Sequence, residues 1–278
     1  MRNFFTLFKY FLGLLLLVIV LVIAGVFFAL HQYKPNLPDV QKLRDVRFQI
    51  PLRIFSADGK LMAEYGEQRR IPISYAEIPD TLRHAILAAE DSRFYEHSGI
   101  DIKGLSRAAF QLISSGEIQS GGSTITMQVA KNFFLSPEQT FVRKFNEILL
   151  SLKIEQELSK EEILELYVNK IYLGQRSYGV QAAANIYYGK DINELSLGQM
   201  ATIAGLPKAP SANNPVRNPQ RSIERRNWIL GRMLSLGYID QSDYDKAIQE
   251  TEIARYHTPD IELSAPYVAE MARAEMVR

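Results

Sequence analysis

An uncharged apolar segment near the amino terminus limits where the rest of this chain can fold. Residues 10–30 contain no charged or strongly polar side chain. A helix that crosses the hydrocarbon core needs about 20 apolar residues, because every backbone polar group there must be hydrogen-bonded within the helix. The apolar core of a cleaved signal peptide is only roughly 7–15 residues long, and residues 27–31 (FFALH) form a poor cleavage site. We therefore predict an uncleaved transmembrane signal anchor over residues 10–30.

The charges that flank this segment predict its orientation. Arg2 and Lys9 precede it with no acidic residue among them, and positively charged flanks stay on the cytoplasmic side. We therefore expect residues 1–9 to form a cytoplasmic tail. The remainder is expected to lie outside the cytoplasm and to begin with a juxtamembrane linker over residues 31–50.

Composition disfavours several classes of function. A net charge of +1 over 278 residues argues against a general nucleic-acid-binding protein. The chain has no cysteine, so it has no disulfide framework, no thiol nucleophile and no thiolate metal site. Its four histidines are scattered and form no HExxH spacing. We predict no metal site and no cofactor, and stimulation by a divalent cation stays open.

Local patterns predict a mainly α-helical exported part with one small β element. Residues 52–56 and 61–65 flank Asp58-Gly59, a pair that suits the positive φ angles of a two-residue hairpin turn. Ser159 and Glu162 form a capping box, and an apolar helical stripe follows it up to Tyr172. A further helix is expected over residues 221–236 and is stopped by Gly237.

Glu90 is the first candidate for chemistry. It follows an apolar helical pattern, falls within or beside the apolar face, and lies near the C-terminal end of that helix. Burial and the negative end of the helix dipole both disfavour a carboxylate and raise its pKa. A general base that works near neutral pH requires such a raised pKa. The alternative is a structural carboxylate that hydrogen-bonds the next turn or pairs with Arg93.

A glycine-rich segment around Ser123 is the second candidate. Gly121 and Gly122 let the backbone approach a ligand closely, and Ser123 is a natural N-cap for the helix that follows. The N-terminus of a helix can receive an anion or a sugar hydroxyl. The segment lacks the Gly-Lys-Ser/Thr of a P-loop. The alternative is an ordinary capped helix start.

A basic cluster, Lys131, Arg143 and Lys144, is the third candidate. Fixed cations can hold a diphosphate and stabilise it as a leaving group. Phenylalanines interleave with these cations, which suits a ligand with a long hydrocarbon tail or contact with the membrane interface. The alternative is a solvated helix face on which Arg143 and Glu147 pair at i, i+4.

Glu147 and Asn169 complete the set of candidates. Glu147 forms a pair of carboxylates with Glu90, an arrangement used in glycosidic-bond chemistry, although the sequence does not give their separation. Asn169 lies opposite the apolar stripe of its helix, and we expect its amide to face a cleft or solvent.

Four motifs in order resemble one family. Residues 90–99 (EDSRFYEHSG) look like the EDxxFxxHxG motif of the peptidoglycan glycosyltransferases, glycosyltransferase family 51. The other three blocks resemble GxSTxxQQ, RKxxE and KxxILxxYLN, and they are residues 122–128 (GSTITMQ), 143–147 (RKFNE) and 160–169 (KEEILELYVN). The likeness spans the chain from the membrane anchor to the C-terminus. The hairpin and residues 264–271 resemble in particular the class A penicillin-binding proteins of the 1A-like subtype.

The resemblance implies a reaction and partners. The substrates are lipid II and the growing glycan strand, and the partners include membrane lipid and other cell-wall synthesis proteins. Glu90 is implied as the general base, with Glu147 supporting the site. Lys131, Arg143 and Lys144 are implied to hold the departing diphosphate. The remaining substrate-binding residues that the resemblance implies are Ser123, Thr124, Gln128, Asn169 and Phe94.

The resemblance also implies a fold and a domain order. We expect a mainly α, lysozyme-like glycosyltransferase domain over residues 51–237, with a small membrane-facing jaw and a short β-hairpin. Class A members continue into a transpeptidase domain, and residues 238–278 are expected to be a C-terminal helical linker toward it. The SxxK motif followed by SxN and KTG, which marks such a domain, is not present in the sequence. The catalytic domain is expected on the periplasmic face of the cytoplasmic (inner) membrane, with a single pass and the N-terminus inside.

Three positions depart from the family pattern. Met127 replaces the first Gln of GxSTxxQQ, Gln139 stands where an Arg is common, and Asn146 stands where a Lys is common. Two expected cations near the diphosphate are therefore absent, and we predict weaker phosphate contacts.

Three other functions compete with a processive glycan polymerase. One is a monofunctional glycosyltransferase that is complete as it stands. Another is a lysozyme-like enzyme that cleaves glycan, which has no need for the diphosphate cations. The last is a non-catalytic, membrane-anchored scaffold, which the intact motif around Glu90 disfavours and the departures at Met127 and Gln139 leave open.

Overall fold

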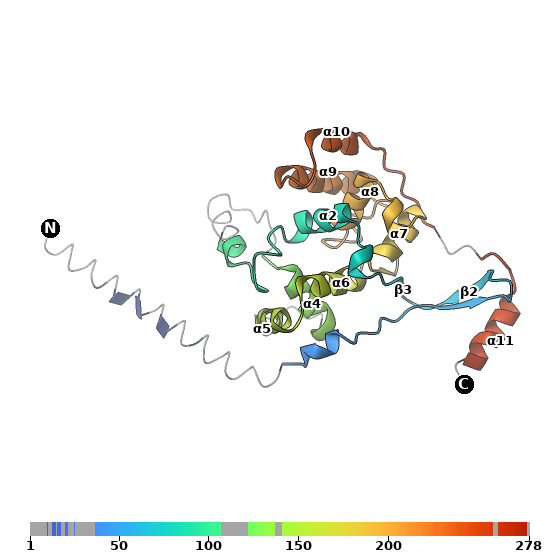
Figure 1. The fold of residues 1–278 in the computed structure, drawn as a ribbon, viewed down its shortest axis with the longest axis horizontal. Helices are drawn as coiled ribbons and strands as arrows, with labels where there is room; N and C mark the ends of the chain where they lie inside the picture. The colour runs from blue at the N-terminus through green and yellow to red at the C-terminus, as the bar shows by residue number, and fades with distance from the viewer. Residues whose placement is uncertain are drawn as a thin grey trace.

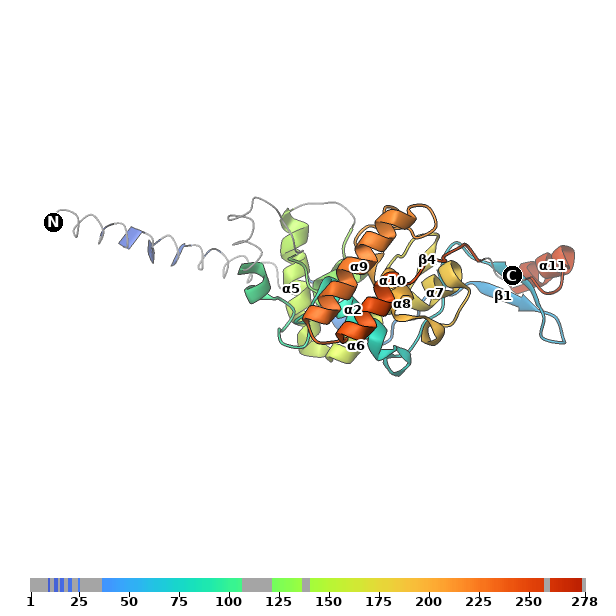
Figure 2. The same ribbon diagram turned by 90° about the horizontal axis from the view of Figure 1, so that it is seen from above.

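The computed structural model describes residues 37–106, 122–136, 141–257 and 261–276, with a few single positions between 10 and 25. The described part is mainly helical with two short sheets (Figures 1 and 2), which confirms the predicted class. The α-helices are α2 (Asp80–Glu90), α4 (Ile125–Phe134), α5 (Phe141–Glu157), α6 (Lys160–Lys170), α7 (Val180–Tyr188), α8 (Leu197–Gly205), α9 (Pro219–Ser235), α10 (Gln241–Gln249) and α11 (Pro266–Met276). The short helices are η2 (Val40–Leu43), η3 (Tyr75–Glu77) and η4 (Ile192–Glu194), and the strands are β1 (Leu52–Phe55), β2 (Leu61–Tyr65), β3 (Arg69–Arg70) and β4 (Ser177–Tyr178).

The predicted membrane anchor over residues 10–30 lies largely outside the described residues. Within the residues that the structure does describe, no helix is both long and apolar enough to cross a membrane. The anchor therefore stays a prediction.

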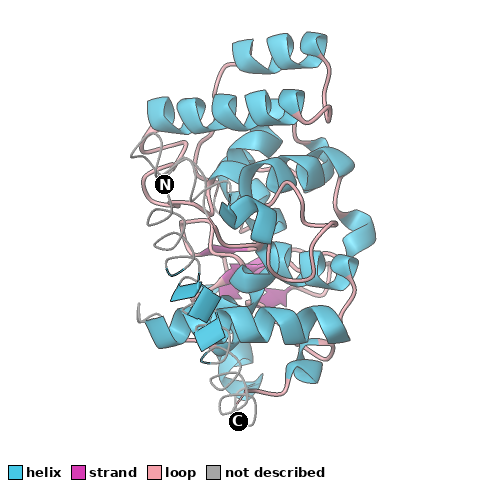
Figure 3. Cartoon of the chain, turned by 90° about the vertical axis from the view of Figure 1, so that its left-hand side faces the viewer, coloured by secondary structure: helices cyan, strands magenta, loops and turns pink. Residues whose placement is uncertain are grey.

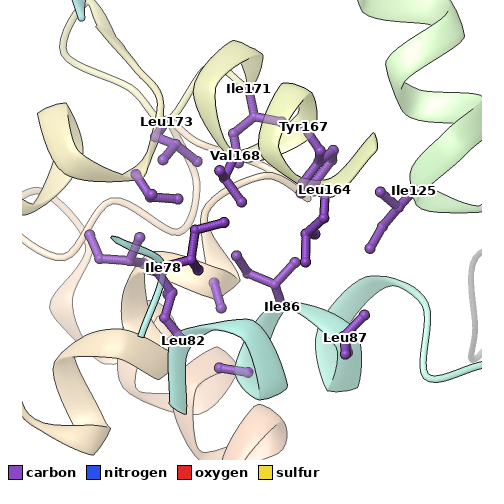
Figure 4. Close-up of a cluster of buried hydrophobic side chains, with 14 of the residues drawn as sticks. Ile78, Leu82, Ile86, Leu87, Ile125, Leu164, Tyr167, Val168, Ile171 and Leu173 are labelled. Carbon is purple, nitrogen blue, oxygen red and sulfur yellow. The ribbon is translucent and has the colours of Figure 1, made fainter. Parts of the chain in front are cut away.

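The main body is a stack of helices around one core. In Figure 3, α10 and α9 lie at one end and α5 at the other, and α2, α8, α6 and α4 lie between them. Figure 4 shows Leu82 and Ile86 of α2 facing Leu164 and Tyr167 of α6 across this core, and all four are at most 1% exposed. Burying such side chains contributes roughly 1.5–3 kcal/mol each.

Local signals set the ends of several helices. Ser159 and Glu162 form the predicted capping box at the start of α6, and α9 ends before Gly237, whose φ of +73° is the left-handed conformation expected of a residue that stops a helix. The predicted stripe to Tyr172 extends two residues too far, because α6 ends at Lys170 and Ile171 is its C-cap.

The predicted hairpin is confirmed. β1 pairs antiparallel with β2, and Gly59 adopts φ +83° in the connecting turn, where a side chain would be strained. The predicted two-residue turn was wrong, because the Ser56 N–H donates to the Lys60 carbonyl across residues 57–59 and Asp58 does not adopt a positive φ. α11 packs on the hairpin, and a small cluster of Ile54, Met62 and Ala269 holds the two together. Figure 1 shows this unit projecting from the body beyond α7.

The packed body extends past both ends of the predicted domain. Val40 and Leu43 of η2 lie in the main core although they belong to the predicted linker over residues 31–50. At the other end, Ala247 of α10 lies in the same core, and Tyr238 and Ile248 pack against it. Gly237 therefore ends a helix without ending the core.

Candidate active site

Glu90 lies where α2, α4 and α9 meet. It is the last residue of α2, and its side chain is 14% exposed. Gln128 of α4 donates from Nε2 to Glu90 Oε2 over 2.9 Å. Arg225 of α9 places Nη2 4.0 Å from Glu90 Oε1. The carboxyl group is thus enclosed, with a hydrogen bond on one oxygen and a cation near the other.

Burial raises the pKa of Glu90 above its ordinary value. Loss of water around a carboxyl group disfavours its charged form. The hydrogen bond from Gln128 and the positive charges of Arg225, Lys208 and Lys131 oppose this shift but do not cancel it. The predicted rise in the pKa is confirmed, so the group is suited to accept a proton near neutral pH.

Two of these cations, Lys208 and Arg225, were not predicted from the sequence. Arg225 lies 4.3 Å from the ring of Trp228, and Gly205 of α8 makes room for it, because a Cβ there would lie 2.9 Å from Arg225 Cγ. For Arg225, the only sequence signal was the group of arginines on α9. Such a group does not show which member faces α2, and the neighbouring Arg226 instead donates to backbone carbonyls.

Glu147 carries a different kind of buried carboxylate. It is 3% exposed, with Arg143 Nε 3.2 Å from Oε1 and Lys144 Nζ 2.8 Å from Oε2. Two cations of the same helix thus neutralise it. The i, i+4 contact between Arg143 and Glu147, which the sequence left as an alternative, is present, and it fixes the position of one cation.

The α4 segment connects the two carboxylates. At its start, Lys144 Nζ donates to Ser123 Oγ over 2.7 Å as well as to Glu147. One turn into the helix, Gln128 binds Glu90. The predicted residues therefore form two groups of polar contacts along α4, one between Gln128 and Glu90 and one in which Lys144 joins Ser123 to Glu147.

Asp91 anchors the segment that follows Glu90. Its carboxylate is 2.9 Å from His97 Nε2 and accepts from the backbone N–H of Ile125 over 3.0 Å. Phe94, predicted to bind substrate, is 1% exposed, and the Lys160 ammonium lies 4.4 Å from its ring centre. The Asp91 contact with Ile125 fixes the end of α2 against the start of α4, and Phe94 packs against the first residue of α6.

Thr124, rather than the predicted Ser123, is the N-cap of α4. Its Oγ1 accepts from the backbone N–H of Met127 over 3.1 Å and donates to the carbonyl of Gly99 over 2.7 Å. Both hydroxyls suit a cap, but Thr124 is the one buried against the loop. Ser123 is left beside Lys144.

The expectation that Asn169 faces a cleft or solvent was wrong. Asn169 is 2% exposed. Its Nδ2 donates to the carbonyl of Ile73 over 2.7 Å, and its Oδ1 accepts from the N–H of Ile73 over 2.9 Å. The chain before η3 passes over this face of α6, which the helical period of α6 alone does not reveal.

The three departures from the family pattern fall in different places. Met127 is 2% exposed, so its side chain packs inside rather than facing the site. Asn146 lies on α5 and is partly exposed. Gln139 lies outside the described residues.

The comparison with protein families decides the assignment. The family model described as Transglycosylase matches residues 58–234, more than half of the chain. The chain belongs to the transglycosylase family. The matched residues include every predicted site residue, and they confirm the prediction of a glycosyltransferase.

Curated relatives agree with this family. The chain is 63% identical over 243 residues to penicillin-binding protein 1A of Pseudomonas aeruginosa, covering 87% of the chain and 30% of the relative. It is 54% identical over 269 residues to penicillin-binding protein 1A of Escherichia coli, covering 96% and 32%. The chain thus spans about a third of the length of these relatives.

A solved structure was also matched. The 2.6 Å crystal structure of penicillin-binding protein 1A from Haemophilus influenzae is 39% identical in sequence to this chain, with a TM-score of 0.47. The match covers 84% of this chain and 25% of the chain in that crystal structure. The relatives and the family match together confirm the predicted resemblance to penicillin-binding protein 1A.

Proposed function

We propose that this chain polymerises lipid II into glycan strands and releases undecaprenyl diphosphate. The observation that carries the proposal is the buried Glu90, whose raised pKa coexists with three cations, Arg225, Lys208 and Lys131, close enough to act on its charge. An acid of this kind beside several cations suits a reaction in which a hydroxyl loses a proton while a phosphate leaves.

Glu90 is proposed as the general base. It removes the proton from the 4-hydroxyl of an incoming lipid II, and the hydroxyl oxygen forms a bond to the anomeric carbon of the growing strand. The bond from that carbon to the diphosphate oxygen breaks, and the diphosphate departs with the electron pair. The proton stays on Glu90 until it is released to solvent.

The cations are proposed to receive the developing charge of the diphosphate. Arg143 and Lys144 are held by Glu147, so their positions are set before the substrate binds. A fixed charge that needs no rearrangement stabilises a transition state more effectively than water does, and one such donor is worth about 10²–10³ in rate. Lys131 is proposed to act with them.

The walls of the sugar clefts are proposed to involve the remaining predicted residues. Ser123 and Gln128 contact Lys144 and Glu90 directly. Thr124, Phe94 and Asn169 are buried. Thr124 binds the backbone of Gly99 and Asn169 that of Ile73, and we propose that these residues shape the clefts by holding the surrounding segments in place.

The finer features of fold and location belong to the same proposal. They are a lysozyme-like domain with a membrane-facing jaw, a single-pass anchor over residues 10–30, and a catalytic part on the periplasmic face of the inner membrane. The relatives are about three times as long as this chain, and we propose that it works in a bifunctional protein beside a transpeptidase domain. Other cell-wall synthesis proteins are proposed partners.

Polymerisation of labelled lipid II tests the proposal. Glu90→Gln should polymerise more slowly than wild type by a factor of about 10²–10⁴, the usual contribution of a general base. Glu224→Gln, on an exposed position of α9 next to Arg225, is the matched control and should polymerise normally. Equal rates for wild type and Glu90→Gln would remove Glu90 as the base. Cleavage of mature glycan without use of lipid II would favour the lysozyme-like alternative.

A further inference from the structure

A cavity lies apart from Glu90, between the base of the hairpin and α7. Its volume is about 450 Å³, within the range of small-molecule sites. The lining residues that matter here are Arg53, Arg69, Arg70, Gln181, Lys190 and His257. No residue assigned above to the Glu90 site lines it. Figure 1 shows β3, which carries two of these arginines, between α7 and the hairpin.

The cavity carries unbalanced positive charge. Its acids are Glu64, which pairs with Arg53 over 2.8 Å, and Asp191, which caps η4 by accepting from the N–H of Asn193. Arg69, Arg70 and Lys190 have no ion pair with any described residue. The lining thus carries four cations, Arg53, Arg69, Arg70 and Lys190, against two carboxylates, Glu64 and Asp191, so positive charge is in excess.

Arg70 shows this imbalance most clearly. It is 5% exposed, and its guanidinium lies 5.2 Å from the ring centre of Phe48 and 5.1 Å from that of Tyr178. It donates to Gln68 Oε1 over 3.1 Å and to the carbonyl of Gln49 over 3.4 Å. Its Nε is buried and has no hydrogen-bond partner among the described residues.

A buried cation without a counter-ion is costly. Buried charges in proteins are normally paired, and an unpaired one loses several kcal/mol of hydration. The backbone holds Arg70 there, because β3 pairs with β4 in a two-residue parallel sheet. The cost is offset when an anion enters the cavity, and a planar guanidinium is well suited to a carboxylate or phosphate.

The opposite wall adds polar groups. Asn185 Oδ1 accepts from Gln181 Nε2 over 2.9 Å, which orients the Asn185 amide so that its N–H groups remain for a ligand. The His257 ring lies against Gly189, where a Cβ would be 2.5 Å from His257 Nδ1. Gly189 also has φ +65°. A side chain at this position would push the histidine out of the cavity wall.

We propose that this cavity binds an oxyanion, either a carboxylate or a phosphate group of a small polar molecule, through Arg70, Arg69 and Lys190. The site is independent of the proposed polymerisation at Glu90. Its cations have no role in the chemistry proposed above, and its ligand is identified here only by the charge and hydrogen-bonding groups that it must present.

Titration of the full 278-residue chain in a non-ionic detergent tests the site. The probes are sodium phosphate and sodium acetate, each at constant ionic strength against sodium chloride. The readouts are the ¹⁵N–¹H signals of the Gly189 amide and the Arg70 Nε. We expect saturable shifts with phosphate, acetate or both. The anion whose shift saturates at the lower concentration shows whether the cavity prefers a phosphate or a carboxylate group.

Variants separate a built site from general charge attraction. Arg69→Gln combined with Lys190→Gln should weaken binding at least tenfold, and Arg70→Met should abolish it. Because Arg70 is buried and its variant can misfold, the double variant at partly exposed positions carries the test. Lys246→Met, an exposed cation of α10, should bind as wild type does.

Two results would overturn the proposal. One is the same shift with chloride as with phosphate and acetate. The other is unchanged affinity in the double variant. Neither result bears on the proposed polymerisation, which the Glu90→Gln assay tests separately.

Discussion

Replacing Glu90 by glutamine should make the fold more stable at pH 8 and change its stability little at pH 4. The reason is the enclosed position of the carboxyl group, 14% exposed, with its pKa raised by burial. The folded protein binds the Glu90 proton more tightly than the unfolded chain does. The stability that Glu90 contributes is therefore complete below its ordinary pKa of 4.5 and is lost as the pH rises through the folded-state pKa.

The size of the effect follows from the same shift. Each unit by which the pKa is raised costs the folded state about 1.4 kcal/mol above the folded-state pKa. Glutamine has the same shape and no charge, so it escapes this cost and can keep the hydrogen bond with Gln128 seen at Glu90. For a domain of roughly 150–250 residues, 1 kcal/mol corresponds to about 2–4 °C in Tm.

Glu147→Gln is the matched comparison, and its effect should have the opposite sign. Its carboxylate lies 3.2 Å from Arg143 Nε and 2.8 Å from Lys144 Nζ, so glutamine leaves two cations without their counter-charge. We expect Glu147→Gln to lower the free energy of unfolding by about 1–3 kcal/mol and to give no gain in stability at pH 8.

Thermal unfolding by circular dichroism at pH 4 and pH 8 measures both variants. The difference in Tm between Glu90→Gln and wild type should grow with pH. A Glu90→Gln protein that is less stable than wild type by the same amount at both values would refute burial as the source of the raised pKa.

Three further changes probe the surroundings of the site. Thr124→Ala removes the N-cap of α4 and should cost about 0.5–2 kcal/mol in urea unfolding, and an unchanged midpoint would contradict the assignment of the cap. Asn169→Ala leaves the N–H and the carbonyl of Ile73 without their partner and should cost about 1–3 kcal/mol, whereas a neutral result would mean that water replaces the amide. Under the proposed function, Gln139→Arg, at a position where the family commonly has Arg, should tighten lipid II binding by adding a cation, and unchanged affinity in a binding titration would count against that reasoning.

Features that depend on neighbouring residues were predictable from the sequence. The hairpin follows from Asp58-Gly59, and the start of α6 follows from the capping box of Ser159 and Glu162. The raised pKa of Glu90 also followed from its place at the end of an apolar helix face. The hairpin and the capping box need no knowledge of what packs on the element from elsewhere. For Glu90 only the direction of the pKa shift was predictable, because the segments that bury it, α4 and α9, come from elsewhere in the chain.

Features that depend on distant segments were not predictable. Asn169 is buried by Ile73, 96 positions earlier, and Arg225 reaches Glu90 from a helix more than a hundred positions later. Helical period places a residue on a face, but it does not say which segment covers that face. The choice of Thr124 over Ser123 as a cap likewise depended on the loop at Gly99.

The packing around Gly237 shows a related limit of local signals. Gly237 stops α9 and is a fair local signal for a boundary. The next helix, α10, starts at its own N-cap, Asp240, and returns to pack on α9. A glycine that ends a helix therefore does not distinguish a turn within a core from the end of a domain.

The pH dependence of lipid II polymerisation tests the central claim most directly. The measurement is kcat/KM for wild type and for Gln128→Leu, which removes the hydrogen bond that lowers the pKa of Glu90. If Glu90 is the base, activity falls on the acid side with an apparent pKa above 4.5, the ordinary value of the group, and this limb moves to higher pH in Gln128→Leu. A limb at or below the ordinary value, or one that stays in place in the variant, would contradict a catalytic role for this buried acid.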